Sequence, residues 1–262
     1  MNGMRTNFSV AKYLVVGPEN TEGRPVPDIV AAAAGAGFTC IQIRSKTASA
    51  GELIRLCGEC ADVLARLGKS DTVALLVDDR LDVVLAARKR GCKVDGIHVG
   101  QTDIPADVCR DCLGEDAVVG LSAPTRDLLE FVRRPDVLTG IDYLGAGPLH
   151  PTPTKAECGL DAATGRVVVR TLGELRELAR LSPVPVVVGG GVKLPDLPDL
   201  AATGVAGFFV VSAVASAPDP ALAATGVAGF FVVSAVASAP DPAQAARELS
   251  AAWDAAVRPA SV

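Results

Sequence analysis

Three polar side chains alternate along a short apolar segment of the chain. Gln42, Arg44 and Lys46 stand two residues apart, and alternate residues of an extended strand point to the same face. An arginine and a lysine on one face suit a diphosphate, because both donate charge-assisted hydrogen bonds. The spacing therefore predicts an anion site at the end of this strand. A layer of salt bridges is the structural alternative.

Carboxylates gather after the next two apolar segments. Asp78 and Asp79 follow Val73–Val77, and Asp103 comes shortly after Gly96–Val99. Clustered carboxylates repel one another unless a cation or a proton lies between them. Mg²⁺ typically takes one or two carboxylates together with waters and phosphate oxygens. The group thus fits an Mg²⁺ site, and helix N-capping by the same residues fits the spacing equally well.

Glycine and hydroxyl residues follow the last two apolar segments. Gly190 and Gly191 come after Val184–Gly189, and Ser212 comes after the segment that ends at Val211. Barrels commonly bind phosphate at this corner, where backbone N–H groups point at the anion. Glycine lets the backbone approach the ligand closely. We expect a phosphate site here, against the alternative of a tight turn with a hydroxyl cap.

A proline-rich stretch, Gly147–Lys155, carries two hydroxyls and one ammonium group, on Thr152, Thr154 and Lys155. Prolines fix φ and stiffen the stretch, so these donors suit an anionic ligand. On spacing alone, a stiff surface loop with a solvated lysine is the better explanation. Ser122 also follows an apolar segment, at a position where it can contribute to the same face.

Short apolar segments alternate with amphipathic ones along the whole chain. This alternation predicts a parallel sheet, and eight units predict an α/β fold with one (β/α)₈ TIM barrel over residues 1–262, whose loops after the strands build the active site. We expect strands at Tyr13–Val16, Thr39–Arg44, Val73–Val77, Gly96–Val99, Val118–Leu121, Tyr143–Gly147, Val184–Gly189 and Gly207–Val211. We expect helices at Pro27–Ala36, Ala50–Leu67, Leu81–Arg90, Ala106–Leu113, Arg126–Arg133, Leu172–Leu181, Pro195–Ala202 and Ala243–Ala256.

One segment is duplicated without a single change: residues 200–221 are repeated as residues 222–243. Each copy carries one strand and one phosphate-type loop, and a closed eight-stranded barrel has no place for a ninth strand. One copy must therefore form the eighth strand while the other is displaced. We favour the first copy for the barrel, because everything upstream is then undisturbed. If the second copy were inside, Val233 and Ser234 would take the place of Val211 and Ser212.

The composition argues against two classes of partner. A net charge of −5 and a pI of about 5.1 do not provide the basic face that nucleic acid requires. No apolar run approaches the roughly 18 residues of a membrane span. We expect a cytoplasmic protein that binds phosphorylated small molecules, with no nucleic acid and no membrane partner. The sequence leaves a homo-oligomer open.

Together these loops resemble those of the thiamine phosphate synthase family, from Tyr13 to the last helix. No single motif is decisive, but their order after successive strands is specific. The motifs are Gln42-x-Arg44-x-Lys46, Asp78-Asp79-Arg80, His98-x-Gly100-Gln101-x-Asp103, Gly120-Leu121-Ser122, Pro151-Thr152-Pro153-Thr154-Lys155, and Gly190-Gly191 with Val-Val-Ser. The resemblance implies a transferase that condenses 4-amino-2-methyl-5-(diphosphooxymethyl)pyrimidine with 4-methyl-5-(2-phosphooxyethyl)thiazole, giving thiamine phosphate and pyrophosphate.

The resemblance also implies a role for each site residue. The pyrimidine diphosphate is held by Gln42, Arg44 and Lys46, with Asp78 beside it. Mg²⁺ is bound by Asp79 and Asp103. The leaving diphosphate is contacted by Ser122 and Lys155. The thiazole phosphate is bound by Thr152, Thr154, Gly190, Gly191, Val211 and Ser212. As catalytic residues it implies Arg44, Lys46, Ser122 and Lys155.

Two departures from the family pattern affect these expectations. The family usually has asparagine where this chain has Asp78, and an acidic residue where it has Ser45. Two alternative functions stay open. One is a barrel of the thiazole tautomerase type, which would not need the Gln-x-Arg-x-Lys and paired-aspartate groups. The other is an inactive ligand-binding barrel, disabled by the duplication at the phosphate corner.

Overall fold

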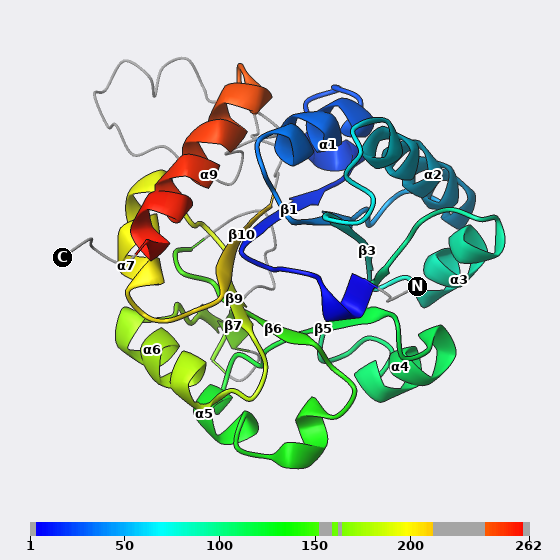
Figure 1. Ribbon diagram of the computed structural model, residues 1–262. Helices are drawn as coiled ribbons and strands as arrows, with labels where there is room; N and C mark the ends of the chain where they lie inside the picture. Colours follow the sequence, from blue (N-terminus) through cyan, green and yellow to red (C-terminus); the bar gives the residue numbers. More distant parts are fainter. Residues whose placement is uncertain (1–3, 152–158, 162–163, 212–238, 259–262) are drawn as a thin grey trace.

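Eight parallel strands close into a barrel surrounded by helices (Figure 1). The computed structural model describes residues 4–151, 159–161, 164–211 and 239–258. Going round the barrel, the strands follow the order β1-β10-β9-β6-β5-β4-β3-β2. They are β1 (Lys12–Val16), β2 (Cys40–Ile43), β3 (Ala74–Asp78), β4 (Gly96–Val99), β5 (Val118–Ser122), β6 (Tyr143–Ala146), β9 (Val186–Val188) and β10 (Gly207–Val211). The prediction of a (β/α)₈ barrel is confirmed.

A helix follows nearly every strand and covers the outside of the barrel (Figure 1). The main helices are α1 (Val26–Gly35), α2 (Ala50–Arg66), α3 (Leu81–Lys89), α4 (Ala106–Leu113), α5 (Leu128–Phe131), α6 (Leu172–Leu181), α7 (Leu197–Ala201) and α9 (Pro242–Val257). Short 3₁₀ turns lie at η1 (Met4–Thr6), η2 (Pro18–Asn20), η3 (Pro135–Leu138) and η4 (Leu194–Asp196).

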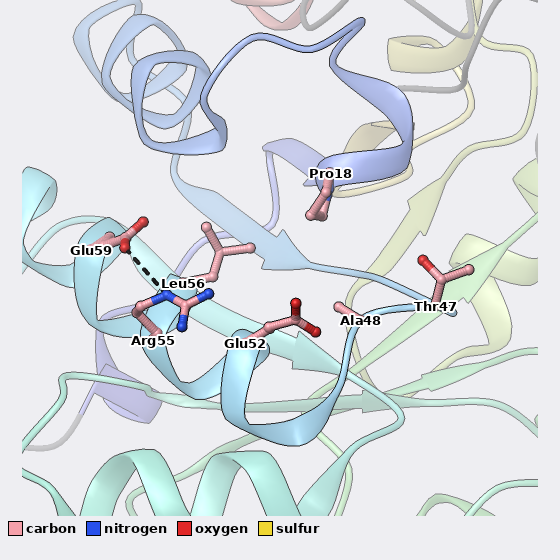
Figure 2. A pocket seen from close by; sticks show the side chains of 7 residues that line it. All are labelled: Pro18, Thr47, Ala48, Glu52, Arg55, Leu56 and Glu59. Carbon is pink, nitrogen blue, oxygen red and sulfur yellow. Dashed lines mark ion pairs between the residues drawn. The ribbon is translucent and has the colours of Figure 1, made fainter.

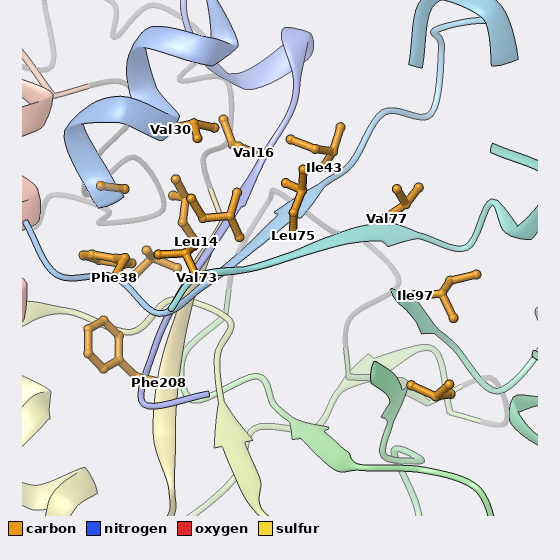
Figure 3. Packing of buried hydrophobic residues seen from close by; sticks show 14 of the residues in the cluster. Leu14, Val16, Val30, Phe38, Ile43, Val73, Leu75, Val77, Ile97 and Phe208 are labelled. Carbon is orange, nitrogen blue, oxygen red and sulfur yellow. The ribbon is translucent and has the colours of Figure 1, made fainter. Parts of the chain in front are cut away.

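The strands are buried on both faces, as continuously apolar segments predict. Residues such as Leu14, Ile43 and Leu75 point outward and pack against the helices (Figure 3). A second, smaller cluster fills the inside of the barrel and includes Val15, Leu76 and the rings of the two tyrosines. Burial of aliphatic side chains on both faces, worth roughly 25 cal/mol per Å², holds the strand ends that carry the polar residues.

The N-terminal segment covers the amino end of the barrel. Phe8 packs against the ring of Tyr143, with ring centroids 6.1 Å apart. The Arg5 guanidinium binds Asp142 at 2.7 Å and Glu115 at 2.6 Å. These contacts close the end of the barrel that lies opposite the polar loops.

The structure differs from the predicted elements in two places. The helix expected over Arg126–Arg133 is reduced to α5, because Asp127 has a left-handed φ of 52° that breaks helical geometry just before it. The connection between β6 and α6 also contains a small antiparallel hairpin, β7 (Leu160–Asp161) and β8 (Arg166–Val167), which the apolar pattern did not predict. Two-residue strands are too short to show a period of two.

The eighth barrel strand, β10, comes from the first of the two identical segments. It pairs with β1 on one side and with β9 on the other. The strand of the second copy lies outside the described residues. Helix α9 packs back on the barrel, with Trp253 5.5 Å from the Phe208 ring, and Lys12 of β1 reaches its Ser250 and Asp254 at 2.9 and 2.8 Å.

Helices of the described chain are too short or too polar to span a membrane. The six cysteines in the described ranges are free thiols. Cys57 and Cys60 lie in the packed face of α2, and burial raises the pKa of the Cys57 thiol to about 12.

Candidate functional site

The end of β2 carries the predicted cationic group. Gln42 is 3% exposed and points into the barrel, while Arg44 follows the strand with its Nε 3.1 Å from Asp78 Oδ2. The Gln42 amide nitrogen donates to the other Asp78 oxygen at 2.5 Å. The alternation expected for Gln42, Arg44 and Lys46 therefore brings all three to one place, on the carboxylates that end β3.

Lys46 joins this group to the next carboxylate. Its Nζ contacts Asp79 and lies 3.5 Å from Asp78 Oδ2. Asp79 has a left-handed φ of 57°, a conformation that aspartate tolerates better than most residues. Its backbone N–H donates to His98 O at 2.8 Å across to β4. The strained turn directs the Asp79 carboxylate towards Lys46 and Asp103.

Asp79 and Asp103 influence each other's ionisation. Burial opposes the charge on Asp79, but the ammonium of Lys46 outweighs it, so the pKa of Asp79 is lowered. Burial and the neighbouring Asp79 carboxylate raise the pKa of Asp103, although its Oδ2 accepts from Gly100 N at 2.8 Å. Two acids that share one site behave in this way, because the charge of the acid that ionises more readily opposes ionisation of the other.

Ser122 ends β5, two strands round the barrel from Asp78. Its Oγ lies 2.9 Å from His98 Nε2, and its backbone carbonyl accepts from Gln101 Nε2 at 2.6 Å. The ring of Tyr143 packs where a side chain at Gly120 would stand, since a Cβ there would lie 2.1 Å from Tyr143 Cζ. The glycine of the Gly-Leu-Ser motif thus makes room for the tyrosine beneath Ser122.

An acidic residue that the sequence analysis missed organises the loop after β2. Glu19 of η2 accepts from the hydroxyls of Ser45 and Thr47, and from the backbone N–H groups of Lys46 and Thr47 at 3.0 and 3.2 Å. Burial opposes its charge, but these donors prevail and lower the pKa of Glu19. A carboxylate thus reaches Ser45 from another element, at the position where the family usually has its own acidic residue.

The phosphate corner is described in part. Gly190 and Gly191 have φ of 77° and 74°, which side-chain-bearing residues rarely adopt. The Gly190 carbonyl accepts from His150 N at 3.0 Å, and a Cβ on Gly191 would lie 2.8 Å from His150 Cβ. The backbone of Val211 pairs with Val15. The predicted residues Thr152, Thr154, Lys155, Ser212, Val233 and Ser234 lie outside the described residues.

A buried network of polar side chains lies under the site, and the sequence motifs did not predict it. The hydroxyls of Tyr13 and Tyr143 are 2.8 Å apart, and Tyr13 donates to Gln42 Oε1 at 2.6 Å. Tyr143 in turn contacts His98 Nδ1 at 2.9 Å. The only sign of this network in the sequence was weak, namely that both tyrosines of the chain lie in predicted strands.

A cavity of about 350 Å³ lies next to the site, between η2 and α2 (Figure 2). Its lining residues are Pro18, Thr47, Ala48, Glu52, Arg55, Leu56 and Glu59. Arg55 and Glu59 form an ion pair at 3.9 Å along α2. The cavity shares the Thr47 loop with the site, but none of the predicted catalytic residues lines it.

The donor set suits magnesium better than a metal caged by protein alone. Among the described residues, no group of three or more His, Cys, Asp or Glu side chains could hold a metal ion. Asp79 and Asp103 are two adjoining carboxylates, and Mg²⁺ usually completes its coordination with waters and substrate phosphate oxygens. The residues present therefore fit the ion that the sequence analysis expects.

Known proteins resemble this chain over most of its length. The sequence profile of the family described as thiamine monophosphate synthase matches residues 12–214. The thiamine-phosphate synthase of Corynebacterium efficiens is 40% identical over 216 residues, which cover 82% of this chain and 92% of the relative. That of Corynebacterium jeikeium is 36% identical over 214 residues, covering 82% and 91%.

A solved structure agrees in fold. The thiamine phosphate pyrophosphorylase from Pyrococcus furiosus superimposes with a TM-score of 0.69 at 24% identity, covering 95% of this chain and 98% of that one. The 3-hexulose-6-phosphate synthase structure is more distant, with a TM-score of 0.57 at 18% identity. At these identities the structural likeness supports the barrel fold alone.

Proposed function

Because the chain belongs to the thiamine monophosphate synthase family, we propose that it joins the aminopyrimidine diphosphate to the thiazole phosphate, forming thiamine phosphate and releasing pyrophosphate. One observation carries this proposal beyond family membership. Gln42, Arg44 and Lys46 meet Asp78 and Asp79 at the carboxyl ends of β2 and β3. Barrel enzymes carry their active sites at this face.

The charges of the described site favour a bound cation. Asp78, Asp79 and Asp103 contribute three carboxylates against the two cationic groups of Arg44 and Lys46. A diphosphate approaching this set would meet surplus negative charge, and like charges disfavour binding in a partly buried site. We propose that Asp79 and Asp103 hold Mg²⁺ with the diphosphate oxygens. When bound, Mg²⁺ would supply positive charge for the leaving group.

The work left to the chain's own residues is electrostatic and geometric. In the proposed reaction the methylene C–O bond breaks, the thiazole nitrogen forms the new C–N bond, and the electron pair of the broken bond leaves with pyrophosphate. The aminopyrimidine ring stabilises positive charge on the methylene carbon. Arg44 and Lys46, held by ion pairs to Asp78 and Asp79, are placed to stabilise the growing charge on the diphosphate.

No general base is needed, because the attacking thiazole nitrogen carries no proton. The remaining requirement is that two bound substrates meet in line. We propose that the thiazole phosphate binds at the corner formed by Gly190, Gly191 and the end of β10, with Thr152 and Thr154 beside it. The left-handed glycines are the kind of backbone that approaches phosphate closely.

Pyrophosphate release tests this proposal. Purified protein should release pyrophosphate only when both substrates and Mg²⁺ are present, and Asp79→Asn should lose most of this release while staying folded by circular dichroism. Release from the pyrimidine diphosphate alone would contradict the condensation. Conversion of a thiazole phosphate isomer without any pyrophosphate would instead support the tautomerase alternative.

A further inference from the structure

Six polar side chains form an unbroken hydrogen-bonded chain through the interior of the barrel. From Asp78 it passes to Gln42 at 2.5 Å and from Gln42 to Tyr13 at 2.6 Å. The two tyrosine hydroxyls are 2.8 Å apart. His98 then lies 2.9 Å from Tyr143 and 2.9 Å from Ser122. The chain thus spans the barrel from the end of β3 to the end of β5.

The direction of this chain is set at Asp78. Its carboxylate forms ion pairs with Arg44 and Lys46, and an ionised carboxylate can only accept hydrogen bonds. The Gln42 amide must therefore turn its nitrogen to Asp78, which leaves its oxygen facing Tyr13. An amide oxygen has no proton, so the Tyr13 hydroxyl donates its single proton to Gln42.

Each following group then has one choice. Tyr13 and Tyr143 are 1% and 0% exposed, and burial raises the pKa of both phenols well above the usual value, so each keeps one proton. The proton of Tyr13 is already committed, and Tyr143 must donate to the Tyr13 oxygen. Tyr143 can then only accept from His98, which requires a proton on His98 Nδ1. Neutral histidine has one N–H, so Nε2 accepts from the Ser122 hydroxyl.

We infer that Tyr13, Tyr143 and His98 are positioning residues that join the two ends of the site through one directed hydrogen-bond chain, with His98 held as the Nδ1–H tautomer. The direction orients the functional groups at both ends. Gln42 keeps its amide oxygen turned inward, away from any ligand, and Ser122 keeps its hydroxyl proton on His98. The role of these residues in turnover rests on the proposed function, whereas the tautomer is a property of the ligand-free protein.

Nitrogen-15 NMR of histidine-labelled protein tests the tautomer directly. The chain contains two histidines, so His150→Gln identifies the signals of His98. At a pH above the normal range of histidine ionisation, His98 should show a protonated Nδ1 and an unprotonated Nε2. A protonated Nε2, with or without a proton on Nδ1, would overturn the inference.

Two variants test the direction of the hydrogen-bond chain. The residue that contacts His98 should have no effect on its tautomer, whereas a residue that does not contact His98 should change it. Ser122→Ala removes a direct hydrogen-bond partner of His98. The tautomer should nevertheless stay Nδ1–H, because the hydrogen bonds of the two tyrosines determine it. Tyr13→Phe removes a hydroxyl that is bonded to Tyr143 and not to His98. It should free the Tyr143 proton to donate to Nδ1, and the Nε2–H tautomer should appear.

The matched control for Tyr13→Phe is Phe8→Leu, which alters packing on the Tyr143 ring without removing a hydroxyl. Phe8→Leu should leave the tautomer unchanged. An unchanged tautomer in Tyr13→Phe, or a reversed one in Ser122→Ala, would each overturn the directed chain. If Tyr13→Phe did not fold, the wild-type and Ser122→Ala spectra would still decide the question.

The KM values of the two substrates test whether the hydrogen-bond chain serves the proposed reaction. Tyr13→Phe leaves the Gln42 oxygen without its donor, so the KM for the pyrimidine diphosphate should rise about tenfold, equivalent to about 1.4 kcal/mol. The KM for the thiazole phosphate should change less than about twofold on the same scale. Equal changes in both would contradict the positioning role. Inactive wild-type protein would contradict the proposed function while leaving the tautomer result intact.

Discussion

Asp78 carries a negative charge at a position where the family usually has asparagine. In this chain the charge is taken up by Arg44 at 3.1 Å and Lys46 at 3.5 Å, the two cationic groups that we expect to bind the diphosphate. The Asp78 carboxylate therefore competes with the diphosphate for Arg44 and Lys46. It also accepts from Gln42, a bond that an asparagine oxygen can keep.

We predict that Asp78→Asn binds the pyrimidine diphosphate more tightly. Removing the charge frees Arg44 for the substrate, and the KM should fall about three- to tenfold, equivalent to roughly 1 kcal/mol of binding free energy. Steady-state kinetics at fixed Mg²⁺ and thiazole phosphate measure the change. Asp82→Asn, which alters an exposed aspartate paired with Arg80, serves as the control. A higher KM in Asp78→Asn would show that the carboxylate assists binding.

Glu19 stabilises the loop after β2 through its charge, so its contribution should depend on pH. We predict that Glu19→Gln lowers the free energy of unfolding by about 1.5 kcal/mol near neutral pH, the low end for hydrogen bonds to a charged acceptor. The folded-state pKa of Glu19 is lowered. Its stabilisation is therefore present above the pKa of the unfolded chain and is lost as pH falls through the folded value.

Urea denaturation of wild type and Glu19→Gln at several pH values measures this contribution. The difference between the two proteins should shrink steadily as pH falls below the usual range of glutamate. A difference that stayed constant down to strongly acidic pH would contradict the electrostatic account of the loop.

The sequence was informative about single residues where their partners lie on the same or the next strand. Alternation along β2 predicted that Gln42, Arg44 and Lys46 share a face, and the structure brings them together on Asp78 and Asp79. Glu19 could not be predicted, because it precedes its partner Ser45 by 26 positions and belongs to a short 3₁₀ turn without a period. Such pairings depend on how the strands close into a barrel.

At the scale of elements, a side-chain contact ties two loops of the phosphate corner together. His150, after β6, lies with its Nε2 2.9 Å from Asp196 Oδ2 in η4. The same oxygen accepts from Lys193 N at 2.7 Å. His150 also donates its backbone N–H to Gly190. These contacts hold the described start of the loop after β6 against both η4 and the Gly190-Gly191 turn.

We predict that Asp196→Ala selectively weakens binding of the thiazole phosphate. Losing two partly exposed hydrogen bonds, roughly 1 kcal/mol each at most, should raise the KM for the thiazole phosphate about tenfold. The KM for the pyrimidine diphosphate should stay the same, because its residues lie on β2 to β5. Asp199→Ala, on the exposed side of α7, provides a matched control. Equal effects on both substrates would contradict the assignment of this corner.

The sequence predicted which helices and strands are present more accurately than it predicted where they begin and end. Strands β1 to β6 stand where alternation of apolar and helical segments placed them, because burial on both faces requires an apolar run. Helix α5 shortened through a local left-handed residue, Asp127, which carries no signal in a hydrophobic pattern. The hairpin β7–β8 is likewise held by contacts that a hydrophobic pattern does not reveal, such as the ion pair of Asp161 with Arg126 from the connection between β5 and α5.

At the scale of the whole molecule, the duplication is the feature that separates this chain from an ordinary barrel. The first copy supplies β10, and the family match ends at residue 214, shortly after that strand. Helix α9 is held on the barrel through Lys12 and Trp253, contacts that do not depend on the length of the connection before it. We propose that the second copy is an insertion that the barrel tolerates.

Deletion of residues 222–243 tests this proposal. Because the two copies are identical, the deletion leaves the sequence at the start of α9 unchanged. A shorter connection loses less conformational entropy when its ends are brought together. The deletion should therefore stabilise the barrel by about 1 kcal/mol and raise Tm by roughly 2–4 °C. Differential scanning calorimetry measures the shift, and kcat should be kept. A collapsed Tm or lost activity would mean that the second copy is part of the fold.

The central claim is that the residues at the carboxyl ends of β2 to β5 carry out a metal-dependent condensation. The most direct measurement mixes purified full-length protein with both substrates and Mg²⁺ and follows thiamine phosphate through its fluorescent oxidation product. We predict product that disappears with EDTA and returns when excess Mg²⁺ is restored. Folded protein that forms no thiamine phosphate, or forms it equally well in EDTA, would contradict the account.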